Sequence, residues 1–306
     1  MSKQSQHDPE KKSDLSASDG LDFTVYTVTE LLVIGNDISK ILRDNIGISS
    51  SQYQILLLLY GKVEGISVSY VSRDLSKPPS TITSALDGLS KKGMISRKFD
   101  SADARVSIVS ITDEGSRIVA LANSILTPYV DEVWSCMSNR QRQLTAWGSV
   151  RATNERGRTV VADGKVDVHS AYCDAIFLSL ETCKRMAKRH DMTLNEYRVM
   201  KTVEFLSNAS AADLCVKLLL SSSEFSQVAS LLMRKGFLER AESPDDRRVH
   251  RFKLTEEGAE AVRAATPDIR RGLRTEAIRI SREEADEYAR IAESVVGAKR
   301  ENFKLR

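Results

Sequence analysis

The side chains in this 306-residue chain with the clearest chemical potential are hydrogen-bonding groups gathered in two places. Ser80–Ser84 is rich in hydroxyls, and Ser222–Gln227 combines hydroxyls with one amide. Each segment is followed by a stretch that carries aspartate and arginine. Hydroxyl, amide and guanidinium groups can bind phosphates and the edges of bases. The pattern therefore indicates a nucleic-acid-binding surface that occurs twice.

Other reactive groups do not form a site. His169 and Cys173 are four residues apart and could share a metal, but no second pair has matching spacing, which favours a boundary histidine and a core cysteine. The four cysteines have no CxxC spacing and are expected to be reduced. Phosphate-loop, GxGxxG, HExxH and GxSxG motifs are absent from the sequence. We therefore predict no enzyme activity, no cofactor and no metal.

The chain repeats itself. A shift of 143 residues aligns 66–115 with 209–258 without a gap, and 13 of these 50 positions are identical. A one-residue change in the preceding loop extends the match to Tyr53 and Tyr197. Two copies of this length indicate two homologous domains rather than a solenoid.

Both copies predict the same order of elements. A long helical pattern opens each copy, and three helices follow at about 50–62, 68–76 and 79–92, and at 194–206, 211–219 and 222–235. Gly93 and Gly236 then act as C′ glycines. Two-stranded hairpins follow at 94–99 and 106–111, and at 237–242 and 249–254. Thr112 and Thr255 are expected to cap the next helix, and a further helix closes each copy.

Two short helices followed by a hairpin form a winged helix-turn-helix, whose second helix enters the major groove while the hairpin wing flanks it. The buried stripe of Ile82, Leu86 and Leu89 leaves the hydroxyls of that helix facing outward. The candidate DNA-contacting residues are Lys77, Ser80, Thr81, Thr83, Ser84, Arg97, Lys98 and Arg105 in copy one, and Ser222, Ser223, Ser226, Gln227, Arg240, Arg247 and Arg248 in copy two.

The wing arginines have a second interpretation. Asp103 can pair with Arg105, and Asp246 can pair with Arg247 or Arg248, which would brace each wing rather than contact DNA. Glu224 would repel phosphate unless it accepts a hydrogen bond from a cytosine amino group.

The chain resembles the MarR family of bacterial transcription regulators over nearly its whole length, twice. The most specific segments in copy two are Leu232–Arg240, Ser243–Arg248 and Leu254–Gly258. Copy one keeps Leu89–Arg97, Asp103–Arg105 and the sequence Ile-Thr-Asp-Glu-Gly that ends at Gly115. The combined pattern of Leu-x-x-Lys-Gly, Asp-x-Arg and Leu-Thr-x-x-Gly carries the resemblance.

The resemblance implies a dimer-like arrangement within one chain. MarR proteins usually form homodimers through their first and last helices, and two-domain Sar-type regulators carry two copies in one chain. The expected fold is mainly α with small β-hairpin wings: two winged helix-turn-helix domains plus a helical pseudo-dimer interface. The expected divisions are a disordered tail at 1–19, domain 1 at 20–155, a linker at 156–165 and domain 2 at 166–306.

Composition limits the partners and the cellular location that the sequence predicts. The net charge of +3 is too small for a polybasic binder, so a nucleic-acid surface must come from local placement of cations. No run approaches the ~18 apolar residues that span a bilayer, and the first 19 residues lack a signal-peptide pattern. These features predict a cytoplasmic protein without a membrane partner.

The predicted function is sequence-specific DNA binding by a transcriptional regulator, most simply a repressor, with both DNA-reading heads in one chain. The heads differ in sequence, so the expected operator is a double-stranded imperfect palindrome. The resemblance also implies an effector response to a small molecule. The alternative is an interaction protein that does not bind DNA and uses the winged-helix scaffold to bind another regulator.

Overall fold

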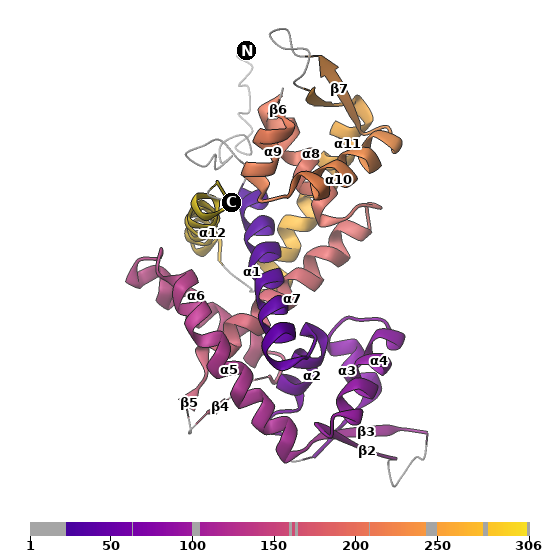
Figure 1. Cartoon of the computed structure of the whole chain (residues 1–306), viewed down its shortest axis with the longest axis vertical. Helices are drawn as coiled ribbons and strands as arrows, with labels where there is room; N and C mark the ends of the chain where they lie inside the picture. The colour runs from indigo at the N-terminus through magenta and orange to yellow at the C-terminus, as the bar shows by residue number, and fades with distance from the viewer. Residues whose placement is uncertain are drawn as a thin grey trace, which may run out of the picture.

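The computed structural model describes residues 23–62, 64–99, 105–158, 161–162, 165–207, 209–242, 250–277 and 281–304 (Figure 1). Copy one contains α1 (Phe23–Ile46), α2 (Ser50–Leu59), β1 (Ile66–Ser67), α3 (Val68–Asp74), α4 (Pro79–Lys91), β2 (Ile95–Phe99), β3 (Ser107–Ile111), α5 (Asp113–Trp134) and α6 (Asn139–Asn154). Copy two contains α7 (Val168–Lys188), α8 (Leu194–Leu206), β6 (Ala209–Ser210), α9 (Ala211–Leu218), α10 (Ser222–Arg234), β7 (Leu238–Glu242), β8 (His250–Leu254), α11 (Glu256–Arg271), the π-helical segment η2 (Gly272–Ala277) and α12 (Arg282–Lys304). The fold is therefore mainly α with small antiparallel sheets, as the sequence predicted.

Helix caps explain why corresponding helices begin at corresponding residues. Ser49 forms a capping box with Gln52 at the start of α2, and Thr193 forms one with Glu196 at the start of α8. In a capping box, the two side chains satisfy backbone N–H groups that have no partner within the helix. Both copies therefore begin the helix-turn-helix region at the same place.

The Leu-Thr-x-x-Gly pattern closes each winged helix. The Thr255 hydroxyl accepts from the Gly258 N–H at 3.0 Å and donates to the Gly236 carbonyl at 2.6 Å. Gly258 lies so close to the Phe237 carbonyl that an added Cβ would be 2.1 Å from its oxygen. Thr112 makes the two corresponding contacts in copy one. The predicted caps are confirmed, and the glycine is needed because the strand backbone passes next to it.

Each wing sheet has one strand more than the two-stranded hairpin that the sequence predicted. The strand orders are β1-β3-β2 and β6-β8-β7, with antiparallel pairing throughout. Strands β1 and β6 have only two residues each. A segment this short shows no alternation of apolar and polar residues, so the pattern that reveals longer strands is absent.

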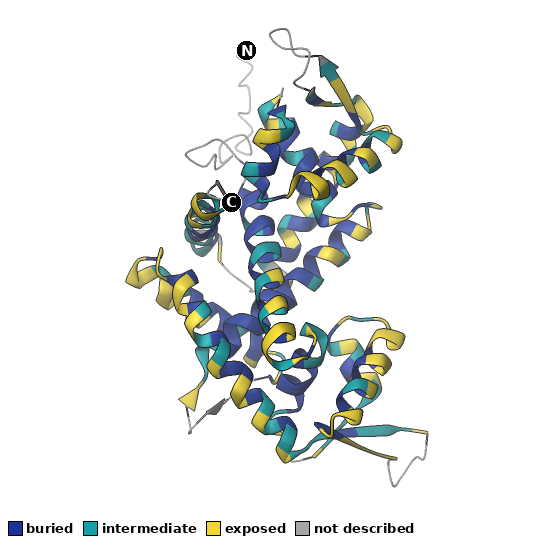
Figure 2. Ribbon diagram, in the orientation of Figure 1, coloured by how far each residue is buried: buried dark blue, intermediate teal, exposed yellow. Residues whose placement is uncertain are grey.

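The first and last helices of the two copies pack against each other. Helix α1 contacts α7 and α12, and α7 contacts α6. Figure 1 shows α1 and α7 crossing the middle of the molecule, where Figure 2 colours much of both helices as buried. At Gly35 of α1, an added Cβ would lie 2.4 Å from Cδ1 of Leu180 on α7, so the helices approach closely there. One hydrophobic core extends through both copies.

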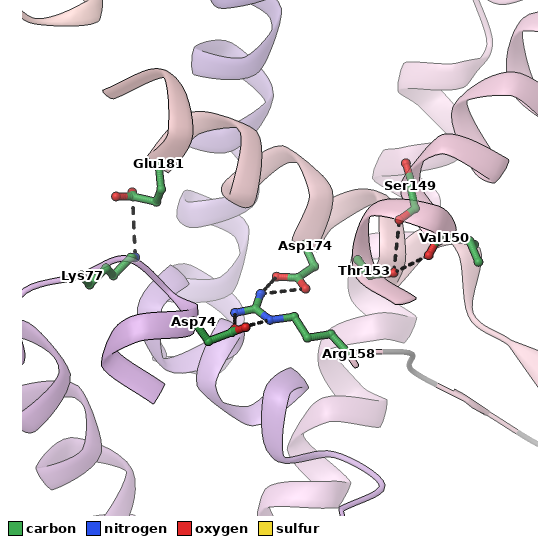
Figure 3. A network of polar contacts seen from close by, with 8 residues as sticks. All are labelled: Asp74, Lys77, Ser149, Val150, Thr153, Arg158, Asp174 and Glu181. Atoms are coloured by element: carbon green, nitrogen blue, oxygen red, sulfur yellow. Dashed lines mark hydrogen bonds and ion pairs between the residues drawn. The ribbon is translucent and has the colours of Figure 1, made fainter. Parts of the chain in front are cut away.

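Part of the segment predicted as a linker is packed into the protein. Strands β4 (Val161–Ala162) and β5 (Lys165–Val166) form a short antiparallel pair. Before them, the Arg158 side chain is fully buried and lies between two carboxylates (Figure 3). Its Nη1 donates to both oxygens of Asp174 on α7 at 2.8 and 2.9 Å, and its Nε donates to Asp74 at the end of α3 at 2.7 Å. Arg158 therefore connects the winged helix of copy one to the first helix of copy two.

Candidate nucleic-acid interface

Helix α4 presents the hydroxyl face that its sequence predicts. Ile82, Ala85, Leu86 and Leu89 are buried against the rest of the winged helix. Ser80, Thr81, Thr83 and Ser84 are exposed on the opposite side. A surface groove runs beside them and is lined by Ser49, Ser51, Gln52, Ser80, Thr81, Ser84 and Ala85. This face combines small donors and acceptors, which suits contact with phosphates or base edges.

Helix α10 presents the corresponding face in copy two. Phe225, Ala229 and Leu232 are buried, and the Phe225 ring packs edge-on against Phe252 of β8 at 5.2 Å between centroids. Ser222, Ser223, Ser226 and Gln227 are exposed. Gln227 differs in kind from the hydroxyls because its amide can both donate to and accept from one base. The two faces are thus similar in position and different in chemistry.

Glu224 has a structural role at the start of α10. Its carboxylate accepts from the backbone N–H of Ser221 at 2.8 Å and from the Ser221 hydroxyl at 2.7 Å. These hydrogen bonds hold the pKa of Glu224 below its usual value. The carboxylate therefore forms a capping box through Oε2, and the possible contact with cytosine stays a prediction.

Lys77 is a correction to the predicted site. Its side chain is only 10% exposed, its Nζ donates to the Ser51 hydroxyl at 2.7 Å, and Glu181 of α7 lies 4.0 Å away (Figure 3). Burial lowers the pKa of the ammonium group. Lys77 follows α3 in the sequence, but the first helix of copy two covers it, so it lies between the copies rather than on the exposed face.

In wing one, Arg97 of β2 contacts the recognition helix. Its Nη2 lies 2.8 Å from Oδ1 of Asp87 on α4. A guanidinium carries five N–H donors, so this ion pair leaves donors that can reach a phosphate. Lys98 and Arg105 are exposed near the end of the wing. Asp103 lies outside the described residues, so the proposed brace between Asp103 and Arg105 stays a prediction.

In wing two, Arg240 of β7 is exposed. Asp246, Arg247 and Arg248 lie outside the described residues. Their assignment to DNA contact or wing bracing therefore stays a prediction.

Two lysines anchor the ends of the recognition helices, and one arginine joins α8 to α9. The Lys92 ammonium donates to the Gly47 carbonyl after α1, and Lys235 donates to the corresponding Asp191 carbonyl after α7 at 2.6 Å. Buried Arg198 of α8 donates to the Leu218 carbonyl at the end of α9 at 2.7 Å. Burial lowers the pKa of Arg198 to about 10. The lysines were visible in the motif, whereas Arg198 has no counterpart in copy one and gave no sequence signal.

The surroundings of His169 and Cys173 agree with the prediction of a boundary histidine and a core cysteine. His169 stacks on Trp134 at 5.3 Å between ring centroids and lies 3.0 Å from Asp131. Cys173 is buried, which raises the pKa of its thiol. Within the described ranges, no cluster of three or more His, Cys, Asp or Glu side chains could hold a metal. None of the helices in those ranges combines the length and hydropathy needed to cross a membrane.

Two regulator families match the chain, one in each copy. Residues 37–121 match the family described as transcriptional regulator SarA/Rot, and residues 190–249 match the MarR family. Both matches include a recognition helix. These families consist of transcriptional regulators rather than enzymes, in agreement with the prediction that the chain is not an enzyme.

Curated relatives carry regulator names and match part of the chain. An uncharacterized HTH-type regulator of Bacillus subtilis, YdgJ, is 31% identical over 98 residues, which cover 32% of this chain and 59% of YdgJ. PrsX, an HTH-type regulator of Escherichia coli, is 26% identical over 130 residues, or 40% of this chain and 76% of PrsX. The chain thus spans about three fifths of YdgJ and three quarters of PrsX.

Two solved structures of MarR proteins match the chain over less than half of its length. AbsC, a MarR family regulator from Streptomyces coelicolor, covers 46% of this chain and 97% of its own, with 18% identity and a TM-score of 0.41. A mutant E. coli MarR complexed with operator DNA covers 38% of this chain and 84% of its own, with 19% identity and a TM-score of 0.35.

Proposed function

Because this chain belongs to the MarR family of transcriptional regulators, we propose that it binds double-stranded DNA through two different reading heads in one chain. The supporting observation is the pair of exposed faces on α4 and α10, each opposite a buried apolar stripe. Both helices lie on the right-hand side in Figure 1, with their wings at opposite ends. Two heads on one side of a molecule suit two successive half-sites of a duplex.

We propose that the two copies form an intramolecular pseudo-dimer. Helix α1 packs on α12, and α7 packs on α6, so the first helix of each copy contacts the last helix of the other. Such reciprocal contacts are what a two-fold dimer interface requires. We assign the two heads to domains at 20–155 and 166–306, with the linker at 156–165 between them.

The preferred operator under this proposal is an imperfect palindrome. The hydroxyls of α4 make less selective contacts than Gln227 of α10, which can bridge N6 and N7 of adenine. The half-site read by copy two should therefore be the more stringent one. A regulator of this kind would act in the cytoplasm as a repressor by occupying a promoter, and a small-molecule effector would release it.

Electrophoretic mobility shifts with the DNA upstream of its own gene test the proposal. We expect specific binding that weakens with salt in proportion to the number of phosphates contacted. The variant Thr81→Asp with Ser226→Asp places one negative charge on each exposed face and should abolish the shift. Asp substitutions at Ser124 and Ser135, which are exposed and belong to α5 and its C-terminal cap rather than to α4 or α10, serve as controls.

The alternative is an interaction protein that uses this scaffold to bind another regulator. It predicts no specific DNA shift at any salt concentration and no effect of the Asp substitutions on α4 and α10. Specific binding by the intact chain, lost in the double variant alone, would exclude it.

A further inference from the structure

A small cavity lies at the junction of the two copies. It has a volume of about 50 Å³ and is lined by residues of α1, α6, α7, η2 and α12. Leu31, Ile176, Leu273 and Ile291 give it largely apolar walls. Because α1 and α6 come from copy one and the other elements come from copy two, the cavity exists only where the copies pack together.

Glu30 of α1 lines this cavity, and none of the described residues pairs with its carboxyl group. The residue is 8% exposed, and in the described part of the chain no donor or cation bonds to it. Burial raises the pKa of Glu30 to about 8. A buried carboxylate is costly unless a cation or hydrogen bonds compensate its charge. The cavity therefore favours an occupant that brings positive charge.

Among the described residues, two hydroxyl groups of α7 in the same cavity also lack a hydrogen-bond partner. Tyr172 is 3% exposed and Ser179 is 1% exposed, and neither side-chain oxygen forms a hydrogen bond within the described part of the chain. Buried hydroxyls in native proteins normally have a partner. One carboxyl and two hydroxyl groups thus line one cavity, each able to accept a hydrogen bond.

The corresponding carboxylate of copy two indicates which kind of group could pair with Glu30. The shift of 144 residues that pairs Tyr53 with Tyr197 also pairs Glu30 with Asp174. Asp174 is buried as well, but the guanidinium of Arg158 binds both of its oxygens. The same position therefore holds a buried acid in both copies, and in copy two the chain itself supplies the cation.

Arg300 is placed like Arg158 but contacts other groups. Arg158 bonds to Asp74 at the end of α3, and Arg300 donates to the carbonyl of Lys217, the position in α9 that corresponds to Asp74. From there the Arg300 guanidinium lies over the ring of Tyr26, 5.2 Å from its centroid, one turn before Glu30. The last helix thus brings a guanidinium near α1, and Glu30 is left facing the cavity.

We propose that this cavity binds a small organic cation, an alkylammonium or guanidinium ion, with Glu30 as its counter-ion and the hydroxyls of Tyr172 and Ser179 as further acceptors. A cavity of ~150 Å³ accommodates benzene, so a cavity of about 50 Å³ limits the ligand to a few heavy atoms. The apolar walls suit a short alkyl group. Binding of the cation to this cavity does not require that the chain binds DNA.

Guanidinium and urea provide a matched test, because they have nearly the same shape and differ in charge. Trp134 packs edge-on against Tyr172 at 5.5 Å, so its fluorescence reports on the cavity, and Trp147→Phe removes the background of the exposed second tryptophan. At pH 7 and constant ionic strength, millimolar guanidinium chloride or ethylammonium chloride should give a saturable change, and urea should give none. Calorimetry in two buffers should detect proton release, because Glu30 loses its proton when the cation binds.

A matched pair of variants makes the test specific. Glu30→Gln should weaken guanidinium binding at least tenfold, while Glu132→Gln, which changes an exposed carboxylate on α5, should leave it unchanged. Circular dichroism is used to check that both variants fold. Equal responses to urea and guanidinium, unchanged binding in Glu30→Gln, or no saturable response to either cation would each overturn the proposal.

Discussion

Gln227 is the residue that most sharply separates the two proposed reading heads. Its exposed amide on α10 has no counterpart on α4, where Ser84 holds the corresponding position. We predict that Gln227→Ala relaxes base preference in one half-site only, with a loss of about 1–3 kcal/mol against the preferred base. Selection from random DNA measures this directly, with Ser84→Ala as the matched change in the other head. A perfect palindrome with equal information in both halves would contradict the prediction.

Arg158 carries the largest electrostatic contribution that we expect between the copies. Removing its guanidinium leaves Asp74 and Asp174 together in a buried place without their cation. Breaking a buried ion pair in this way costs about 3–5 kcal/mol. Urea unfolding of Arg158→Met should therefore show a loss of this size, and adding Asp74→Asn and Asp174→Asn should recover much of it. A loss below about 1 kcal/mol would mean that water already screens the network.

Glu30 should make stability depend on pH. Its pKa rises from 4.5 to about 8 on folding, so between these values the folded state keeps a proton that the unfolded state has lost. Stability from this group is complete below pH 4.5 and falls as pH rises towards 8, by up to about 1.4 kcal/mol per unit. The unfolding free energy of Glu30→Gln, minus that of the wild type, should therefore grow from pH 5 to pH 8 in urea titrations. A constant difference would argue against a buried, unpaired carboxyl group.

Individual residues also show where sequence reasoning succeeds and fails. The exposed and buried faces of α4 and α10 follow from helical periodicity, and the structure confirms them. Lys77 was misassigned because its environment is set by Glu181, which is distant in sequence. The capping role of Glu224 was not predicted, although the Ser-x-x-Glu spacing of a capping box was visible in the sequence. The buried contacts of Arg158 join three distant segments, and no local pattern indicates them.

At the scale of elements, local signals placed the helices well. Cap residues and C′ glycines are local, so the predicted start of α4, α8, α9 and α10 agrees with the structure. The third strand of each wing sheet and the β4–β5 pair depend on pairing partners elsewhere in the chain. The π-helical segment that follows α11 likewise gave no periodic signal. Local chemistry therefore predicted element positions, whereas contacts between elements required the structure.

Two glycines give a paired prediction for elements. Gly258→Ala forces a Cβ to within 2.1 Å of the Phe237 carbonyl oxygen, so the junction of wing and α11 must shift and stability should fall. Gly297 lies inside α12, with nothing within 4 Å of an added Cβ. Gly297→Ala should stabilise the protein by about 0.5–1 kcal/mol, because alanine favours helix. Thermal unfolding measures the stability of both variants. A destabilising Gly297→Ala would show that other groups pack against α12 at Gly297.

At the scale of the whole molecule, the joined copies predict a single chain per operator. The apolar stripes on α1, α6, α7 and α12 are covered by each other, so the interface is present without a second chain. We expect a complex containing one 34.0 kDa chain per DNA duplex, with an affinity that does not change when the protein is diluted before DNA is added. Native mass spectrometry measures the stoichiometry. Two chains on one duplex would contradict the prediction.

The repeat has a consequence for how such a regulator changes over generations. In a homodimer, each codon of the recognition helix specifies a residue in both subunits. A substitution therefore alters the contacts with both half-sites at once. Here α4 and α10 are encoded separately, and only 13 of 50 aligned positions around them are still identical. If the two helices read separate half-sites as proposed, substitutions in one helix would change the preferred sequence of one half-site while the other helix still binds its original half-site. Glu30 and Asp174 are likewise encoded separately, so a mutation can remove or add the cation beside one acid without changing the other.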